Sequence, residues 1–285
     1  MVIRIDLNIL IRDIAGPNPI FRIAFIHVDA DRELTLFHNA EQGTFGSSGV
    51  AAVADDGLIV IPDIGLGGIE FCTGVPLDKI IMQAVNEHND GILYEKLTAL
   101  AAFLATVHNR SARPVGVDFY SSCSYFDATL QSASTLMDSG EYQYFRDLKE
   151  RWIKEPAVWQ DQQVLTHGDA TPSNFLFGDG MYVISFDLER ARRTDRVFDV
   201  GRIVAELQHF FLRSTGNKYA AEPFIGHFLW EYAGHFPDRD SAFASINARI
   251  PFYSGTNLLR ISRNTYLDVE YRRLLIEEAK LALRK

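Results

Sequence analysis

The sequence predicts an α+β protein with two lobes, a small β-rich N-terminal lobe over residues 1–70 and a larger helical C-terminal lobe over residues 71–285. Three observations support this prediction. Short apolar runs separated by turn residues fill the N-terminal part, which is typical of strands. Beyond residue 76 the apolar residues recur at helical spacing, and one β-rich insert at 163–188 carries several polar residues. This order predicts a cleft between the lobes, with the insert beside it.

Turn residues divide the N-terminal lobe into short elements. A Gly-Pro-Asn turn at 16–18 separates two β-rich stretches, which predicts a hairpin. A helix is expected over 30–41. Two strand-like runs follow at 49–55 and 57–64, divided by an Asp-Gly turn, so the lobe is predicted to consist mainly of sheet.

The helical lobe contains an amphipathic stretch at 93–108, where Leu97, Leu100 and Leu104 recur at helical spacing. A second helix is expected near 140–154. The β-rich insert predicts a hairpin, because a Gly-Asp-Gly turn lies between two apolar strands. A helical tail is expected to fill most of the remaining chain, with its clearest pieces at 198–211, 223–236 and 269–285.

Composition and charge limit the partners. Apolar residues make up 47% and charged residues 23%, as in folded proteins. The formal net charge of -9 argues against nucleic acid and anionic membranes, and neither a signal peptide nor a membrane span is indicated. Cys72 and Cys123 lack metal-ligand spacing, so we expect a cytoplasmic protein. The expected partner is a small-molecule substrate, and the oligomeric state stays open.

The segment at 166–177, THGDATPSNFLF, carries the most informative polar residues. Asp169 is followed five positions later by Asn174 on a tight loop, and Asp187 comes 13 positions after that, at the end of an apolar strand. Phosphoryl transfer needs a carboxylate to orient the attacking hydroxyl, and oxygen ligands that hold magnesium on the phosphates. These three residues therefore favour a phosphotransferase site.

Each residue of this pattern also has an ordinary interpretation. Taken singly, His167 is a hydrogen-bonded loop histidine, Asp187 an acid in a turn after a strand, and Asp199 a helix N-cap. Taken together, the pattern resembles the catalytic loop and metal strand of the aminoglycoside phosphotransferase and choline kinase family, which has a protein-kinase-like fold. A single register without gaps extends this resemblance to Glu189, Ala191, Asp195 and Asp199.

The resemblance implies a role for each matched position. Asp169 would be the catalytic base or the group that orients the hydroxyl, and His167 would support the loop. Asn174 and Asp187 would be magnesium ligands. Asp199 would brace the loop from the helical side.

The resemblance is weaker on the nucleotide side. It implies that Ile61, Pro62, Asp63 and Ile64 lie near adenine; the alternative is an edge strand that enters a loop. Arg22 stands where the family has a lysine that contacts phosphates, with Glu33 as its expected partner; the alternative for Arg22 is an exposed strand charge. The glycine-rich stretch GTFGSSG follows Glu33 instead of preceding Arg22, so the usual phosphate-covering loop is missing.

The expected function is that of an ATP- and magnesium-dependent phosphotransferase acting on a hydroxyl of an aminoglycoside, an amino alcohol or a sugar-like metabolite. The alternative is a catalytically impaired pseudokinase that binds nucleotide or metabolite. A shortened lobe that still binds ATP, a true start upstream and a loss of catalysis all fit the N-terminal departures. Glu206, Glu231 and Asp268 are candidates to contact a cationic amine of the acceptor, or are simply solvated helix acids.

Overall fold

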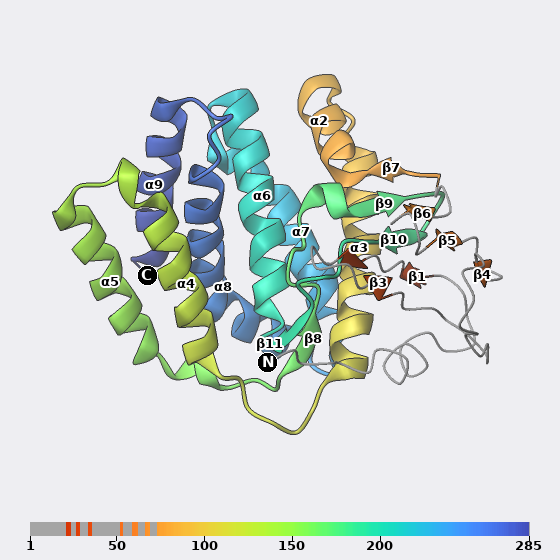
Figure 1. Cartoon of the computed structure of the whole chain (residues 1–285), viewed down its shortest axis with the longest axis horizontal. Coiled ribbons are helices and arrows are strands. Elements are labelled where there is room, and N and C mark those ends of the chain that lie inside the picture. Colours follow the sequence, from red (N-terminus) through yellow and green to blue (C-terminus); the bar gives the residue numbers. More distant parts are fainter. Residues whose placement is uncertain are drawn as a thin grey trace.

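The computed structural model describes residues 73–284 and, before them, the backbone of several short strands (Figure 1). These strands are β1 (Phe21–Ile23), β2 (His27–Val28), β3 (Leu34–Thr35), β4 (Ala52–Val53), β5 (Ile59–Ile61) and β6 (Leu66–Gly68). Strand β2 pairs antiparallel with β3, and β5 pairs antiparallel with both β4 and β6. The two strands predicted at 49–55 and 57–64 are therefore confirmed where they are described.

One N-terminal prediction is wrong at the residues that can be tested. A helix is expected from the sequence over 30–41, but Leu34–Thr35 form strand β3. Leu34 and Thr35 pair with β2, and threonine is a β-branched residue that favours strands. Pairing with a neighbouring strand overrides the weak helical pattern of a short segment. The hairpin expected around the turn at 16–18 lies outside the described residues, apart from β1.

The insert in the helical part forms the central strands of a four-stranded sheet, in the order β1-β10-β9-β7. Its members from the insert are β9 (Phe175–Phe177) and β10 (Val183–Ser185), which form the predicted antiparallel hairpin. Gly180 in the connecting turn has φ +57°, a conformation that glycine adopts without strain. Strand β7 (Val75–Pro76) pairs with β9, and β1 pairs parallel with β10.

A second, two-stranded sheet pairs β8 (Val164–Thr166) with β11 (Arg192–Thr194). In the sequence, β8 precedes the polar segment of the insert and β11 follows it. Pairing of β8 with β11 therefore closes the segment into one long loop that carries the β9–β10 hairpin. Strand β11 is not predicted by the sequence, because its Arg-Arg-Thr run has no apolar alternation.

Eight helices follow one another in the part of the chain that the structure describes. They are α2 (Leu77–Glu87), α3 (Asp90–Ser111), α4 (Phe119–Ala133), α5 (Ser139–Ile153), α6 (Val197–Thr215), α7 (Glu222–Ala233), α8 (Arg239–Ser262) and α9 (Val269–Leu283). The predictions near α3, α5, α6, α7 and α9 are confirmed. None of the helices in the described residues combines the length and the apolar composition needed to cross a membrane.

Helix α4 is not predicted by the sequence, because FYSSCSYFDATLQSA is rich in serine and aromatic residues of modest helix propensity. Packing stabilises it instead. Phe119, Cys123, Phe126 and Leu130 follow one another at helical spacing and are all buried. Asp118 caps the helix by accepting a hydrogen bond from the backbone N–H of Tyr120 at 3.1 Å.

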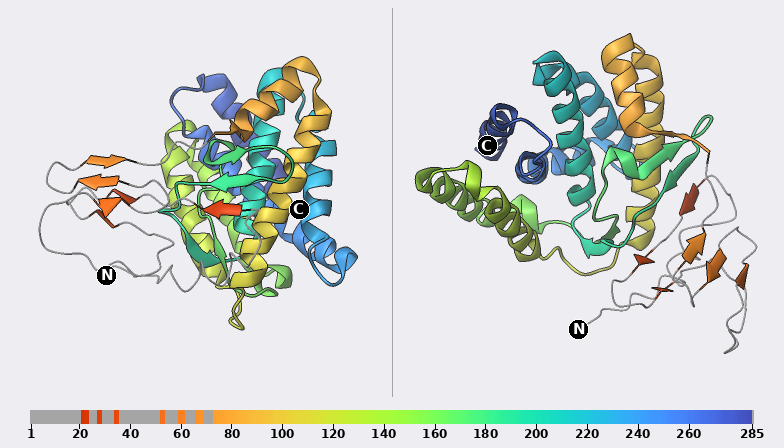
Figure 2. Two further views of the ribbon diagram at one scale, coloured as in Figure 1. Left: turned by 90° about the vertical axis from the view of Figure 1, so that its right-hand side faces the viewer. Right: turned by 45° about the horizontal axis from the view of Figure 1, so that its top comes forward.

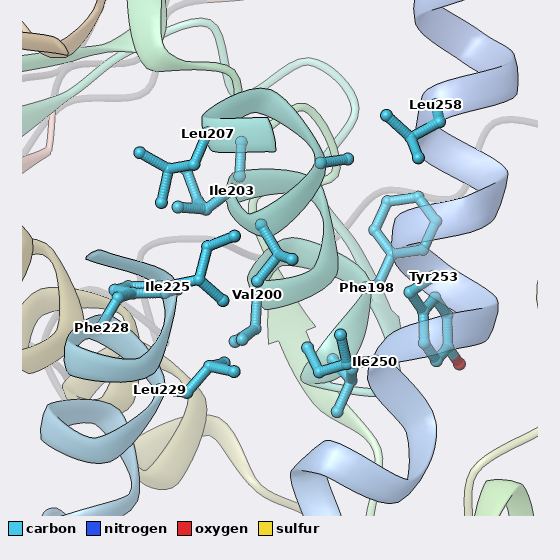
Figure 3. Close-up of a cluster of buried hydrophobic side chains, with 14 of the residues drawn as sticks. Phe198, Val200, Ile203, Leu207, Ile225, Phe228, Leu229, Ile250, Tyr253 and Leu258 are labelled. Atoms are coloured by element: carbon cyan, nitrogen blue, oxygen red, sulfur yellow. The ribbon is translucent and has the colours of Figure 1, made fainter. Parts of the chain in front are cut away.

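Helix α6 lies at the centre of the helical part, between α7 and α8 (Figure 3). Phe198, Val200, Ile203 and Leu207 on α6 meet apolar side chains from both neighbours. Figures 1 and 2 place α5 and α9 on one side of the molecule and the β9–β10 hairpin on the other. Helix α6 is thus largely buried among its neighbours, which fixes the positions of its side chains.

Gly201 allows α6 and α8 to approach closely, because a Cβ atom there would lie 2.5 Å from the Cβ of Tyr253. We expect Gly201→Ala to lower the free energy of unfolding by about 1–3 kcal/mol through overpacking. Gly226→Ala in α7 is the matched control, since nothing lies within 4 Å of the position that its Cβ would take, and it is expected to be neutral or slightly stabilising. Urea denaturation of both variants measures the difference; equal stabilities would contradict the close packing.

Candidate active site

The loop that follows β8 carries the residues of the predicted catalytic motif. It continues through a short 3-10 turn, Pro172–Asn174, into β9. The side-chain amide of Asn174 donates to the backbone carbonyl of Asp169 at 2.9 Å, so Asn174 fixes the loop that bears Asp169. Gly168 has φ +81°, and a Cβ atom on it would lie 1.9 Å from the carbonyl oxygen of Arg190. Only glycine fits between these two segments.

Asp199, in the first turn of α6, holds this loop from the helical side. Its carboxylate is fully buried and accepts the backbone N–H groups of His167 at 2.6 Å and Gly168 at 3.1 Å. The bracing contact predicted for Asp199 is therefore confirmed. Burial alone would raise the pKa of Asp199, but the hydrogen bond from His108 and the contacts with His167 outweigh it and lower the pKa.

His108, near the end of α3, completes this support and is a functional residue that the sequence does not reveal. Its Nε2 lies 3.2 Å from a carboxylate oxygen of Asp199 and donates to it, because a carboxylate has only acceptors. Its Nδ1 contacts the hydroxyl of Tyr232 on α7 at 2.7 Å. The sequence offers one signal for this residue, since His108 lies on the apolar face of the helix predicted at 93–108. In the structure, the side chain of His108 is completely buried.

The side chain of His167 contacts the backbone of its own loop. Its Nδ1 accepts the backbone N–H of Asp169 at 3.3 Å, and its ring packs 5.2 Å from that of Phe175. Its Nε2 is buried without a hydrogen-bond partner among the described residues. Burial lowers the pKa of His167, which keeps the ring neutral at pH 7.

The carboxylate of Asp169 is surrounded by arginines that no sequence motif predicts. Arg202 on α6 donates to Oδ1 of Asp169, and Arg260 on α8 donates to the same oxygen at 3.0 Å. Arg190, which follows the β10 strand, lies 3.4 Å from Oδ2. These residues come from three separate segments, so no motif spacing reveals them.

Arg260 also pairs with Glu206, one of the acids considered for a cationic amine. The guanidinium of Arg260 lies 3.2 Å from the carboxylate of Glu206, so this acid already has a cationic partner within the protein. Asp268 is the N-cap of α9, where it accepts the backbone N–H of Tyr271 at 2.7 Å. Glu231 acts electrostatically on His235. Among the described residues, Glu206 and Asp268 therefore have partners within the protein.

Asn174 and Asp187 are brought together by the hairpin. The backbone N–H of Phe186, the residue before Asp187, donates to the carbonyl oxygen of Asn174 at 3.3 Å. Asp187 is exposed and has φ +64°, a conformation that aspartate tolerates better than most residues. Burial and a hydrogen bond with Asp187 raise the pKa of Glu189, which places two carboxyl groups in contact at this point.

These oxygen donors suit a magnesium ion, which takes one or two protein carboxylates and completes its coordination with substrate phosphates and water. Burial and the contact with Asp187 raise the pKa of Glu189, and a nearby positive charge would offset the repulsion between the two carboxylates. In the described part of the chain no three acidic, histidine or cysteine side chains gather as a metal cluster. The amide nitrogen of Asn174 donates to the backbone carbonyl of Asp169, which leaves its amide oxygen, with the carboxylate of Asp187, to act as the protein ligands of such an ion.

The residues predicted to bind nucleotide are placed only in part. Arg22 lies in β1, in register with Ile184 of β10, and Ile61 ends β5. The structure does not describe the side chains of Arg22 and Ile61, and Glu33, Asp63 and Ile64 lie outside the described residues. Their assignment to the nucleotide stays a prediction.

Comparison with solved structures defines the class of fold. Two crystal forms of glucosamine kinase each match at 15% identity with a TM-score of 0.51 and cover 76% of this chain. An ethanolamine kinase from Plasmodium vivax matches at 14% identity over 75% of this chain, with a TM-score of 0.47. This chain spans 60% and 57% of the length of the two glucosamine kinase chains and 62% of the ethanolamine kinase. The fold is protein-kinase-like, α+β, as the sequence predicted.

A family model described as "Phosphotransferase enzyme family" matches residues 32–233, more than two thirds of the chain. The chain therefore belongs to the phosphotransferase enzyme family. This result confirms the resemblance to aminoglycoside phosphotransferases that the motif indicated. Among curated proteins, none is similar enough to this chain to match.

Proposed function

We propose that this chain is a kinase that transfers the terminal phosphoryl group of ATP to a hydroxyl group of a small molecule. One observation carries the proposal: a single loop and hairpin bring together Asp169, Asn174 and Asp187, with the loop fixed by Asn174 and Asp199. In this reaction a bond forms between the hydroxyl oxygen and the terminal phosphorus, and the bond to the bridging oxygen breaks, releasing ADP.

Each residue has a defined role in this proposal. Asp169 orients the hydroxyl and accepts its proton, while His167 keeps the loop backbone in place. Asn174 and Asp187 hold magnesium, which would neutralise charge on the phosphates. Residues 1–70, with Arg22, Glu33, Ile61, Asp63 and Ile64, form the nucleotide side, and residues 71–285 carry the catalytic loop and metal strand. The cytoplasm is the proposed location.

A pseudokinase is the second candidate, and one observation favours it. The carboxylate of Asp169 already accepts hydrogen bonds from Arg202 and Arg260, so an acceptor hydroxyl must compete for the same group. Among the residues that the structure describes, Oδ2 of Asp169 contacts Arg190 alone, at 3.4 Å, and the side chain of Arg190 is 57% exposed. The kinase proposal therefore assigns the hydroxyl to Oδ2.

An assay of ADP release separates the two candidates. The purified chain is incubated with ATP, magnesium and each of several alcohols, including glucosamine, ethanolamine and glucuronate. ADP release that depends on an alcohol supports the kinase. Stabilisation of the chain by ATP and magnesium, without ADP release from any alcohol, supports the pseudokinase.

Removal of the proposed metal ligand tests the magnesium site. We expect Asp187→Ala to weaken magnesium-dependent ATP binding by about tenfold or more, because a carboxylate ligand and its charge are lost. Asp187 is exposed, so the expected cost to folding is limited to the strain of placing alanine at φ +64°, about 1 kcal/mol. Thermal shifts with ATP are compared in magnesium and in EDTA; Asp179→Ala, in the exposed hairpin turn, is the control. An unchanged magnesium dependence in Asp187→Ala would exclude this ligand.

A further inference from the structure

Three arginines surround the carboxylate of Asp169. Arg190, Arg202 and Arg260 each place a guanidinium nitrogen within 4 Å of its carboxylate. Three carboxylates contact these arginines: Asp169 contacts all three, Glu206 lies 3.2 Å from Arg260, and Glu189 lies 3.4 Å from Arg190. Burial raises the pKa of Glu206 despite the nearby arginines.

Arg202 serves the protein's own structure. Its Nε donates to Asn257, one terminal nitrogen donates to Asp169 and to the carbonyl of Gly168, and the other donates to the hydroxyl of Tyr125. Its side chain is 1% exposed. All three of its nitrogens thus have partners, and a ligand has no access to it.

Arg260 differs from Arg202 in both respects. One terminal nitrogen pairs with Glu206 and the other with Asp169, but its Nε is buried with no hydrogen-bond partner among the described residues. Its side chain is 13% exposed, which matches the 12% of Asp169. Arg260 and Asp169 therefore both reach solvent while they are in contact with each other. Arg190 contacts the same carboxylate from the exposed side.

We propose that the alcohol acceptor carries an oxyanion, a carboxylate or a phosphate, and that Arg260 binds it with Arg190 beside it. This inference rests on the proposed kinase function. An arginine has a planar fork of donors that matches the oxygens of such a group. A cationic amine at the same place would meet three guanidinium groups and only acids that are already paired.

The binding of a minimal oxyanion tests the site without knowledge of the acceptor. The probe is inorganic phosphate, compared with sodium chloride at equal ionic strength by thermal unfolding. We expect phosphate to raise the Tm of the wild-type chain by about 3 °C at ten times its dissociation constant. Arg260→Gln should lose this increment, whereas Arg213→Gln, which removes an exposed arginine of α6, should keep it.

Arg260→Gln leaves Glu206 buried without its partner, so the double variant Arg260→Gln/Glu206→Gln guards against a loss of folding. It should fold and also lack the phosphate increment. An increment of equal size in the wild type and in the folded Arg260 variant, or no increment in the wild type, would overturn the oxyanion site.

Matched acceptors separate a failure of this inference from a failure of the kinase proposal. Glucuronate, glucose and glucosamine share a sugar ring and differ in charge. ADP release with glucosamine but not glucuronate would leave the kinase standing and refute the anionic acceptor. Phosphate binding that depends on Arg260, without ADP release from any alcohol, would support the oxyanion site and count against the kinase.

Discussion

Asp169→Asn is expected to reduce the rate of phosphoryl transfer by about 10²–10⁴-fold, because an amide neither accepts the hydroxyl proton nor orients it as a carboxylate does. Binding of ATP and magnesium should persist, since Asn174 and Asp187 remain. Turnover is measured by ADP release under single-turnover conditions. Retention of normal turnover would remove Asp169 from the chemistry.

The structure adds a second effect to this substitution. The sequence alone predicts little change in folding, but Asp169 also neutralises Arg202 and Arg260. Its loss weakens hydrogen bonds between charged groups, each of which contributes about 1.5–3 kcal/mol. Rates must therefore be compared well below the Tm of the variant. The nucleotide-induced thermal shift serves as the control that the rest of the site is intact.

Asp199→Ala is expected to lower the free energy of unfolding by about 3–5 kcal/mol, because it leaves the backbone N–H groups of His167 and Gly168 and the ring of His108 without their buried acceptor. Turnover should fall by about 10²-fold, since the loop that carries Asp169 loses its position. Chemical denaturation and ADP release measure the two effects.

Asp199→Ser is the informative companion, because serine is polar but too short to reach the loop. The single-residue interpretation of Asp199 as a helix N-cap is wrong, since Asp195 accepts the backbone N–H of Val197 at 2.9 Å. Full activity in Asp199→Ser would refute the bracing role. The pKa of Asp199 is lowered on folding, so its stabilising contribution is present above its unfolded pKa of about 3.8 and is lost as the pH falls through the lower folded value. Stability measured below about pH 4 should therefore fall less steeply in Asp199→Ser than in the wild type.

The grouping of Asp169, Asn174 and Asp187 was predictable because these residues are local in sequence. Asp169 and Asn174 share one loop, Asp187 follows the adjoining hairpin, and both loop and hairpin have turn residues with a clear physical meaning. The contact of Asp199 with the loop was implied by the family resemblance, whereas its position at the start of a helix alone indicated an N-cap. The amphipathic helices were predictable for the same reason, since one buried face imposes a regular spacing.

The arginines around Asp169 were not predictable. Arg202 is on α6 and Arg260 on α8, and in sequence each is an arginine within an otherwise ordinary helix. Only the packing of α6 against α8 brings them to one carboxylate. Likewise, His108 looks in sequence like one more residue on an apolar face, because hydrogen bonding between distant helices leaves no mark on spacing.

The chain of hydrogen bonds from Tyr232 through His108 and Asp199 to the loop has a consequence for local unfolding. A surface loop ordinarily opens by itself at little free-energy cost. Here the backbone amides of His167 and Gly168 are tied to α6, and through His108 to α3 and α7. The loop and these three helices thus form one cooperative unit, in which the segment that bears Asp169 opens only when the buried interior of the protein opens with it.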